Sequence, residues 1–356
     1  MRIRLLFAPL SLVGILALSS CSTLGYYSQA VGGHLDIMLR ARPLDRVIED
    51  PREPEVVRDR LRIARDARMF AAAQLGLPLN RSYERYVDVG RPAVTWNVTA
   101  TPALSVQPVE WCYPVAGCFS YRGYFSRSDA QRYAESLRER GFDVYVSGAS
   151  AYSTLGWFDD PLLSTMLRRS EAELVATLFH ELAHQKLYLR GDSAFNESFA
   201  VAVAEEGVRR WFHGSEKYVN YVRDQERLRA VASLLVGARE RLAAVYAEDI
   251  PDAEKLARKR DVLAKLRADY AGLKGKWGGY DGFDHWFPPN INNAHLALTA
   301  TYHELVPGFK ALLVLEGGDL NRFYAAARKL AGLERSARKQ HLHAAVAQAQ
   351  AEHPDS

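Results

Sequence analysis

Apolar residues in the first part of the chain recur at helical spacing among charged residues. Between residues 26 and 75 they are Leu39, Leu44, Ile48, Val56, Leu61, Ile63, Met69, Phe70 and Ala73. Steps of three and four residues are typical of helices with one buried face. The pattern therefore predicts a helical N-terminal segment over residues 21–80.

From residue 83 the pattern changes to short aromatic and β-branched stretches. They cover residues 94–98, 118–121 and 143–146, and Gly and Pro lie between them. Such stretches predict the strands of a sheet. Between the last two, we expect Ser128 to cap a short helix that runs to Arg138 and ends at Gly141.

Beyond Pro161 the chain is predicted to be almost wholly helical. Apolar residues at alternating three and four spacing fill residues 224–273 on both sides of the turn Ile250-Pro251-Asp252. They predict an antiparallel helical hairpin over 223–275. A break rich in Gly, Pro and Asn begins at 278, inside a C-terminal helical region over 276–356. The predicted fold class is α+β, with a sheet followed by helices.

Composition excludes several classes of protein. The 356 residues are 48% hydrophobic and 25% charged, which is neither disordered nor polytopic membrane composition. A net charge of +4 and a pI of 8.8 are too small for a nucleic-acid-binding surface, so no nucleic-acid partner is expected.

The N-terminus has the features of an export signal. Arg2 and Arg4 precede 14 uncharged residues from Leu5 to Leu18. A helix of that length rises about 21 Å, which is short of a hydrocarbon core of about 30 Å. We therefore expect residues 1–20 to be a cleaved leader.

The leader ends in Leu18-Ser19-Ser20-Cys21, which resembles a bacterial lipobox. This resemblance implies a lipid on Cys21 and a bacterial envelope protein held on the membrane by acyl chains. Because residue 22 is Ser and not Asp, the sorting pattern of Gram-negative lipoproteins implies the outer membrane, facing the periplasm. The alternative is a plain secretory signal with an incidental cysteine.

Two cysteines remain, Cys112 and Cys118, with a Pro and a Gly between them. In an oxidising compartment we expect them to form a disulfide. The alternative is a pair of free, buried thiols.

The residues with the clearest chemistry lie on one expected helix that opens at Ser170. It contains His180-Glu181-Leu182-Ala183-His184, an HExxH motif. Histidines four residues apart share a helix face, so both rings can reach one metal ion, while Glu181 can approach a metal-bound water. The alternative is two ordinary buried histidines. Glu197 follows 13 residues after His184 in Asn-Glu-Ser-Phe-Ala.

HELAHQ followed by NESFA resembles the gluzincin metallopeptidases, in particular the aminopeptidase-N-like pattern. The resemblance implies His180, His184 and Glu197 as ligands of one Zn²⁺ per chain and Glu181 as the general base. Together with the lipobox and the string WCYPVAGCFSYRGYF, it extends to a family of bacterial aminopeptidases that are predicted lipoproteins. It implies a zincin-like catalytic core over 81–222, with a mixed sheet and an edge strand within residues 148–161 that pairs with substrate.

The sequence departs from that pattern in three places. The connection between His184 and Glu197 is short, with Gly191 to turn the chain. No glutamate stands where such enzymes bind the substrate amine, which leaves Asp159 or Asp160 for that role or for an ordinary loop. Val201 replaces an aspartate that supports the ligands in thermolysin-like enzymes, so that support must come from another residue, with Asp192, Glu205 and Glu206 as candidates.

A gluzincin also needs a donor for the oxyanion of the tetrahedral intermediate. Tyr302 is the first candidate, in the C-terminal region that would complete the cleft, and Tyr280 is the second. The sequence thus predicts a lipid-anchored zinc peptidase, with aminopeptidase specificity less firmly indicated than peptide hydrolysis. The alternative is a catalytically silent envelope lipoprotein that binds a protein partner through the helical hairpin.

Overall fold

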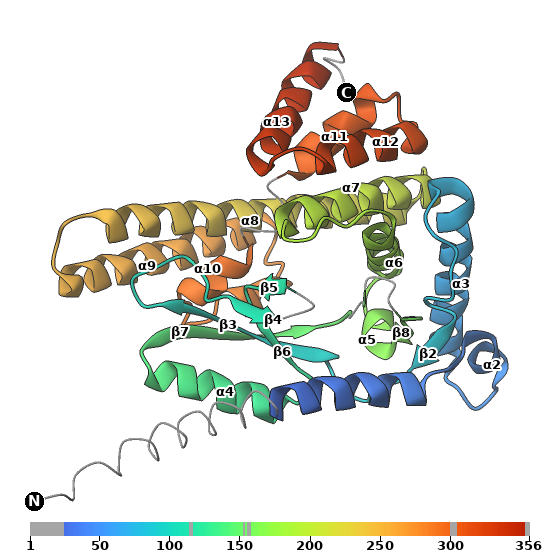
Figure 1. The fold of residues 1–356 in the computed structure, drawn as a ribbon, viewed down its shortest axis with the longest axis horizontal. Helices are drawn as coiled ribbons and strands as arrows, with labels where there is room; N and C mark the ends of the chain where they lie inside the picture. The colour runs from blue at the N-terminus through green and yellow to red at the C-terminus, as the bar shows by residue number, and fades with distance from the viewer. Residues whose placement is uncertain (1–24, 114–116, 152–153, 155–157, 300–304, 353–356) are drawn as a thin grey trace, which may run out of the picture.

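A computed structural model describes residues 25–113, 117–151, 154, 158–299 and 305–352. The predicted leader, Cys21 and Tyr302 lie outside these ranges. Within them, no helix combines the length and the apolar character that crossing a bilayer requires. The fold is α+β, with small sheets surrounded by helices (Figure 1).

The N-terminal segment is helical, as predicted. A helix over residues 25–40 is followed by α2 (Leu44–Glu49) and α3 (Glu55–Leu75). A three-stranded sheet joins this segment to the rest of the chain, because β1 (Arg42–Pro43) pairs antiparallel with β2 (Arg85–Val87), and β2 pairs parallel with β8 (Leu162–Leu163). The short helix α5 (Ser164–Leu167) follows directly.

A second sheet has the order β6-β3-β7 and is antiparallel. Its strands are β3 (Thr95–Pro102), β6 (Arg122–Tyr124) and β7 (Phe142–Ala149), and a separate hairpin pairs β4 (Trp111–Tyr113) with β5 (Gly117–Phe119). Helix α4 (Arg127–Glu139) covers one face of the sheet, and α10 (Asn293–Thr299) packs against β3 and β7 (Figure 1). The predicted cap of α4 was wrong, since Ser126 and not Ser128 accepts the hydrogen bond from the Asp129 amide.

The edge strand expected within residues 148–161 overlaps the structure only at its first two residues. Strand β7 lies at one edge of this sheet and ends at Ala149. The described residues between 150 and 161 have no strand pairing. The Asp160 carboxylate accepts from the amide and the hydroxyl of Thr154, both at 2.8 Å, and the Asp160 carbonyl accepts from the Tyr83 amide at 2.7 Å.

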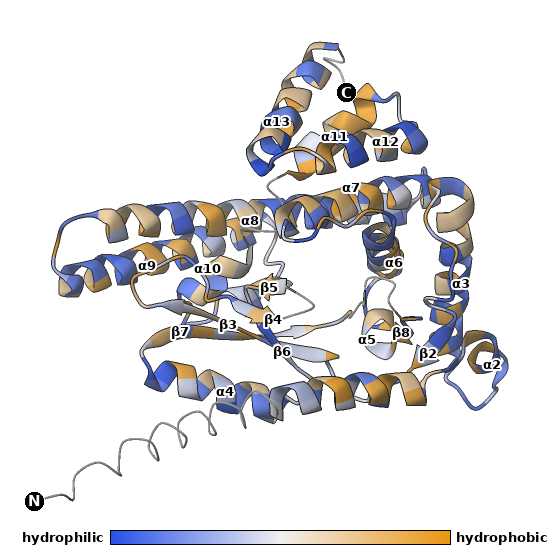
Figure 2. Cartoon of the chain, viewed as in Figure 1, coloured by the Kyte–Doolittle hydropathy of each residue, from blue (hydrophilic) through white to orange (hydrophobic). Residues whose placement is uncertain are grey.

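The predicted hairpin is present. It consists of α8 (Glu216–Ala247) and α9 (Asp252–Lys276), and it begins seven residues before the expected start at 223. Leu235, Leu242 and Leu266 are buried between its two helices, and hydrophobic and hydrophilic residues alternate along both (Figure 2). The partner expected at this hairpin stays a prediction.

Three helices form the C-terminal end: α11 (Val306–Leu315), α12 (Leu320–Ala331) and α13 (Arg335–Glu352). A short 3₁₀ turn, η1 (Asp284–Trp286), precedes α10 in the Gly- and Pro-rich break. Helices α11–α13 lie on the outer side of α7 (Ser193–Trp211), as Figure 1 shows. The largest apolar core is built from α3, α6 (Glu171–Lys186), α7 and these C-terminal helices. Helices α6 and α7, which carry the predicted ligands, are therefore held from several sides.

Candidate metal centre

Helix α6 begins at the predicted cap and is fixed by a reciprocal pair of hydrogen bonds. The Ser170 hydroxyl accepts from the Glu173 amide at 3.2 Å, and the Glu173 carboxylate accepts from the Ser170 amide at 3.0 Å. This capping box satisfies two amides that the helix itself leaves without partners. Leu178, Phe179 and Leu182 bury the helix, which leaves His180 and His184 on the side that faces α7.

The short connection between α6 and α7 is held by the side chains of α7 itself. The Asn196 amide group accepts from the Leu189 backbone N–H at 2.7 Å and donates to the Leu189 carbonyl at 2.8 Å. Asp192 caps α7 by accepting from the Phe195 amide at 3.2 Å. Gly191 has a φ of 83°, as its predicted role in the turn requires. These contacts place Glu197, in the second turn of α7, opposite the two histidines.

A glycine permits the close approach of α7 to α6. A Cβ on Gly207 would lie 2.4 Å from the Phe179 ring and 2.7 Å from a Leu75 methyl. Any other residue would force α7 away from α6 and α3, because both neighbouring side chains are fully buried.

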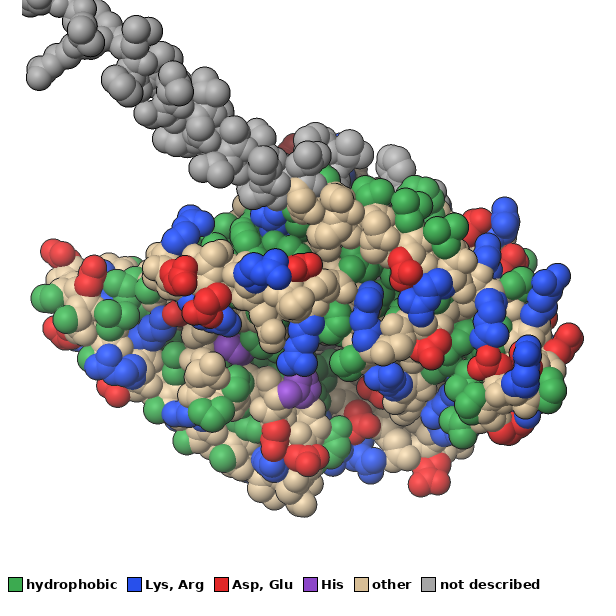
Figure 3. Space-filling view, turned by 90° about the horizontal axis from the view of Figure 1, so that it is seen from below, with side chains coloured by type: hydrophobic (Ala, Val, Ile, Leu, Met, Phe, Trp, Pro, Cys, Tyr) green, Lys and Arg blue, Asp and Glu red, His purple; other side chains and the backbone are tan. Residues whose placement is uncertain are grey.

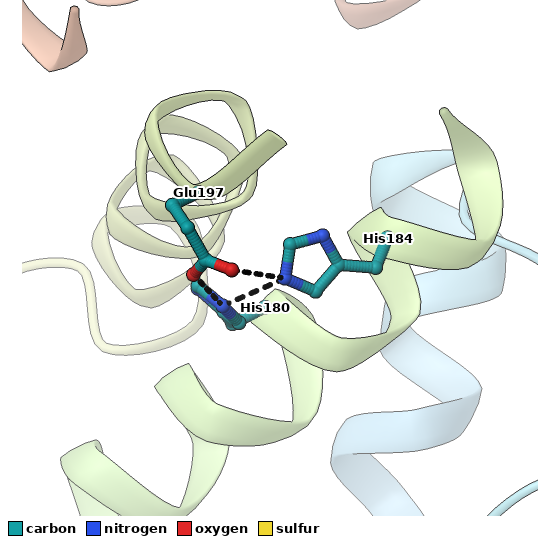
Figure 4. Close-up of side chains that lie close together, drawn as sticks. All are labelled: His180, His184 and Glu197. Carbon is teal, nitrogen blue, oxygen red and sulfur yellow. Dashed lines mark hydrogen bonds and ion pairs between the residues drawn. The ribbon is translucent and has the colours of Figure 1, made fainter. Parts of the chain in front are cut away.

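The three predicted ligands meet at one point (Figure 4). His180 Nε2 lies 3.0 Å from His184 Nε2 and 3.3 Å from Glu197 Oε2, and His184 Nε2 lies 3.7 Å from Glu197 Oε1. The side chain of His184 is 6% exposed, whereas those of His180 and Glu197 are about one-fifth exposed. The cluster is therefore closed on the His184 side and open on the other.

The two imidazoles have opposite electrostatic environments. Burial and the neighbouring His180 ring lower the pKa of His184 to about 4, so this ring is neutral and offers a lone pair. Burial also opposes charge on His180, but the hydrogen bond to Glu197 and the charges of Glu197 and Glu181 together outweigh it and raise the pKa of His180. Binding of a cation here has to displace the proton that His180 shares with Glu197.

The donor atoms fit a tetrahedral zinc ion. Bonds of about 2.0–2.2 Å separate neighbouring ligand atoms of such an ion by about 3.3–3.6 Å. The three separations here are 3.0, 3.3 and 3.7 Å. Two imidazoles and one carboxylate are also the donor set of catalytic zinc sites. His184 Nδ1 is buried and has no hydrogen-bond partner within the described part of the chain.

Glu181 and two tyrosines surround the cluster. The Glu181 carboxylate contributes to the raised pKa of His180, which places its charge beside the cluster. Burial, followed by the charges of Glu197, Tyr188 and Glu181, raises the pKa of Tyr121 to about 12. The Tyr188 ring lies 6.3 Å from that of His184.

Sequence reasoning missed both tyrosines. Tyr188 lies four residues after His184, just beyond the end of α6 at Lys186, so the helical spacing of the histidines does not extend to it. Tyr121 comes from the segment between β5 and β6, so no local pattern connects it to α6.

The other predicted residues lie elsewhere or bond elsewhere. The Tyr280 ring contacts the Arg227 guanidinium on α8, at 4.1 Å from the ring centre. Asp159 forms an exposed ion pair with Arg81. Asp160 is buried and holds its own loop through Thr154.

The three candidates for supporting the ligands are engaged with cations. Glu205 pairs with Arg229 and Lys310, and Glu206 pairs with Arg209 and Arg210. Asp192 pairs with Arg338 on α13, at 2.6 Å. Asp192 thus supports Glu197 indirectly, by fixing the start of the helix that carries it.

Cys112 and Cys118 form a disulfide across the β4–β5 hairpin, where the strand register places them opposite each other with Cα atoms 3.9 Å apart. This hairpin leads directly into the segment that carries Tyr121. The structure thus contains the predicted disulfide and not the alternative pair of free thiols.

A comparison with protein families gives one match. The profile of the family described as "Putative aminopeptidase" matches residues 25–342. The chain belongs to this family. The match runs from the N-terminal helix into the first part of α13, and it indicates a peptidase. No curated protein and no solved structure matched the chain.

Proposed function

We propose that this member of the aminopeptidase family is a zinc-dependent metallopeptidase with a zincin-like catalytic domain. One Zn²⁺ per chain would be held by His180, His184 and Glu197. When bound, zinc supplies positive charge that acidifies water and polarises a carbonyl.

The observation that carries this proposal is the convergence of three ligand-type side chains from two helices. Their separations match a tetrahedral ion, and the cluster is open on one side, as a catalytic site requires. Family membership supplies the reaction class independently, since the profile is that of a peptidase family.

Glu181 is the general base in this proposal. Its carboxylate lies beside the cluster without belonging to it. It accepts the proton of the attacking water and then delivers that proton to the leaving amine, because one carboxyl group can act first as a base and then as an acid. A binding protein would have no use for a carboxylate at this position.

We propose Tyr121 as the donor to the oxyanion. Its phenol is partly buried and sits near both Glu197 and Glu181, and its raised pKa keeps it protonated. A protonated phenol can donate a hydrogen bond to the negative charge that develops on the oxyanion. Tyr302, the first candidate from the sequence, lies outside the described residues, and the ring of Tyr280, the second, contacts Arg227 on α8.

We also propose that the chain is anchored by lipid on Cys21 and faces the periplasm. The support is the lipobox that follows the uncharged leader. The disulfide agrees with an oxidising compartment.

The decisive experiment compares two substitutions on α6. We expect purified protein to bind about one zinc ion, and Glu181→Gln to lower kcat for a peptide at least 100-fold while zinc content stays unchanged. Glu173→Gln is the matched control, because Gln also completes a capping box and activity should remain at the wild-type level. Hydrolysis by zinc-free protein, or wild-type kcat in Glu181→Gln, would contradict the proposal.

Specificity is tested with one peptide in two forms. The family predicts that the form with a free N-terminal amine is cleaved and that the acetylated form is not. Equal cleavage of both would show an endopeptidase, and the zinc chemistry would be unaffected by that result.

A further inference from the structure

The helix over residues 25–40 has a second apolar face that the fold leaves exposed. Its large exposed hydrophobic side chains are Tyr27, Val31, Leu35 and Leu39, and their exposed fractions are 38%, 57%, 51% and 82%. They are spaced by four residues, so they form one stripe along the helix. We call these four residues the outer stripe.

The opposite face of the same helix is fixed to the protein. The Gln29 side chain donates to the Gly123 carbonyl at 3.3 Å and accepts from the Phe125 amide at 3.0 Å, both at strand β6. Ile37 is buried in the main core, at 1% exposure. The helix therefore cannot rotate to bury the outer stripe in the protein.

The outer stripe lies on an outer surface of the molecule. Figure 1 shows the helix in line with α4 on the lower side, away from α7 and the C-terminal helices. Figure 3 views that side and shows hydrophobic side chains beside the point where the grey N-terminal segment leaves the body. Charge is balanced here, because Asp36 and Arg40 form an ion pair within the helix.

We propose that the outer stripe lies on the lipid bilayer. This inference rests on the proposed anchor at Cys21 and not on the proposed peptidase chemistry. Only three residues separate Cys21 from the start of the helix at residue 25, and the four chain steps between them reach at most about 14 Å. A lipid on Cys21 thus holds the start of the helix at the membrane surface.

The helix has the dimensions and composition of an interfacial helix. Its 16 described residues extend about 24 Å, which is too short to span a bilayer but enough to lie along its surface. Burial of three aliphatic side chains that are more than half exposed adds to the acyl chains, and it fixes the orientation of the protein as well as its attachment. Because Gln29 bonds to β6, the sheet and the hairpin with the disulfide are then held at one fixed height above the lipid.

The test uses the chain from residue 21 with Cys21→Ser, so that acyl chains contribute nothing. Flotation with vesicles of phosphatidylethanolamine and phosphatidylglycerol measures the partition coefficient. We expect the combined substitution Val31→Gln, Leu35→Gln and Leu39→Gln to lower this coefficient at least tenfold. Gln keeps helix propensity, and equal circular dichroism melting curves verify folding.

A matched control removes equally exposed hydrophobic residues from other helices. Val56, Met69 and Val219 are 72%, 51% and 62% exposed, and their replacement by Gln should leave flotation unchanged. Equal loss in the control, no loss in the stripe variant, or no flotation of the parent chain would overturn the proposal. So would a dimer of the parent chain in solution that the stripe substitutions dissociate, since the outer stripe would then bind a second copy. None of these outcomes bears on zinc binding or hydrolysis, which Glu181→Gln tests.

Discussion

The ion pair between Asp192 and Arg338 joins the helix that carries Glu197 to the C-terminal helix α13. Arg338 donates to Asp192 Oδ2 from Nε at 3.2 Å and from Nη2 at 2.6 Å, and its guanidinium also reaches the Leu333 carbonyl. The two side chains are 10% and 5% exposed. Asp192→Asn is the informative change, because Asn has the same shape and caps helices as well as Asp.

The magnitude follows from the burial. Removal of one partner of a buried pair costs about 3–5 kcal/mol, since the other charge remains unpaired. Asn retains one acceptor for the guanidinium, so we expect a loss of about 2–4 kcal/mol in the free energy of unfolding. The double variant with Arg338→Met has no stranded charge and should recover part of this loss.

Urea denaturation followed by circular dichroism measures the effect, with and without a zinc chelator. Asp319→Asn is the control, because Asp319 also caps a helix, α12, but is exposed; it should cost less than about 0.5 kcal/mol. We also expect zinc affinity to fall about tenfold in Asp192→Asn, since the first turn of α7 positions Glu197. Equal free energies of unfolding for Asp192→Asn and Asp319→Asn would refute the argument that the Asp192–Arg338 pair stabilises the fold through its burial.

Two further predictions concern pH dependence and catalysis. Burial raises the pKa of Glu205, but Lys310 and Arg229 outweigh it and lower that pKa. The ion pairs of Glu205 with Lys310 and Arg229 therefore stabilise the fold above the ordinary carboxyl pKa, and this stabilisation is lost as pH falls through the lowered pKa. Glu205→Gln should thus have a lower Tm than the wild type at pH 7, and the difference should shrink below about pH 4. A difference that stays constant with pH would contradict this. Tyr121→Phe should lower kcat about 100-fold with zinc content unchanged, and wild-type kcat would exclude Tyr121 as the oxyanion donor.

The sequence predicted well what local spacing determines. The histidine pair, the Ser170 cap and the two helices of the hairpin depend on residues three or four positions apart, and the structure has all of them. Glu197 was predicted from a motif and not from spacing, and the structure places it against the histidines.

The failures arose where contacts between distant segments decide. Strand β7 ends at Ala149, and Asp160 then bonds to Thr154 in the loop that follows, a contact that no alternation of residues reveals. Tyr121 lies about 60 residues before His180, and Arg338 lies 146 residues after Asp192. Only the packed fold brings these residues together, so no local pattern predicts them. Short strands of two or three residues, such as β1 and β8, are too short to show a period.

The close approach at Gly207 has a consequence for sequence variation. Glu197 and Gly207 lie ten residues apart on helix α7, about 15 Å along its axis. A methyl group at position 207 would push this part of α7 away from Phe179 and Leu75. Because the helix is rigid, the same shift would also move Glu197. Members of the family that keep both histidines and the glutamate should therefore also keep glycine at this position.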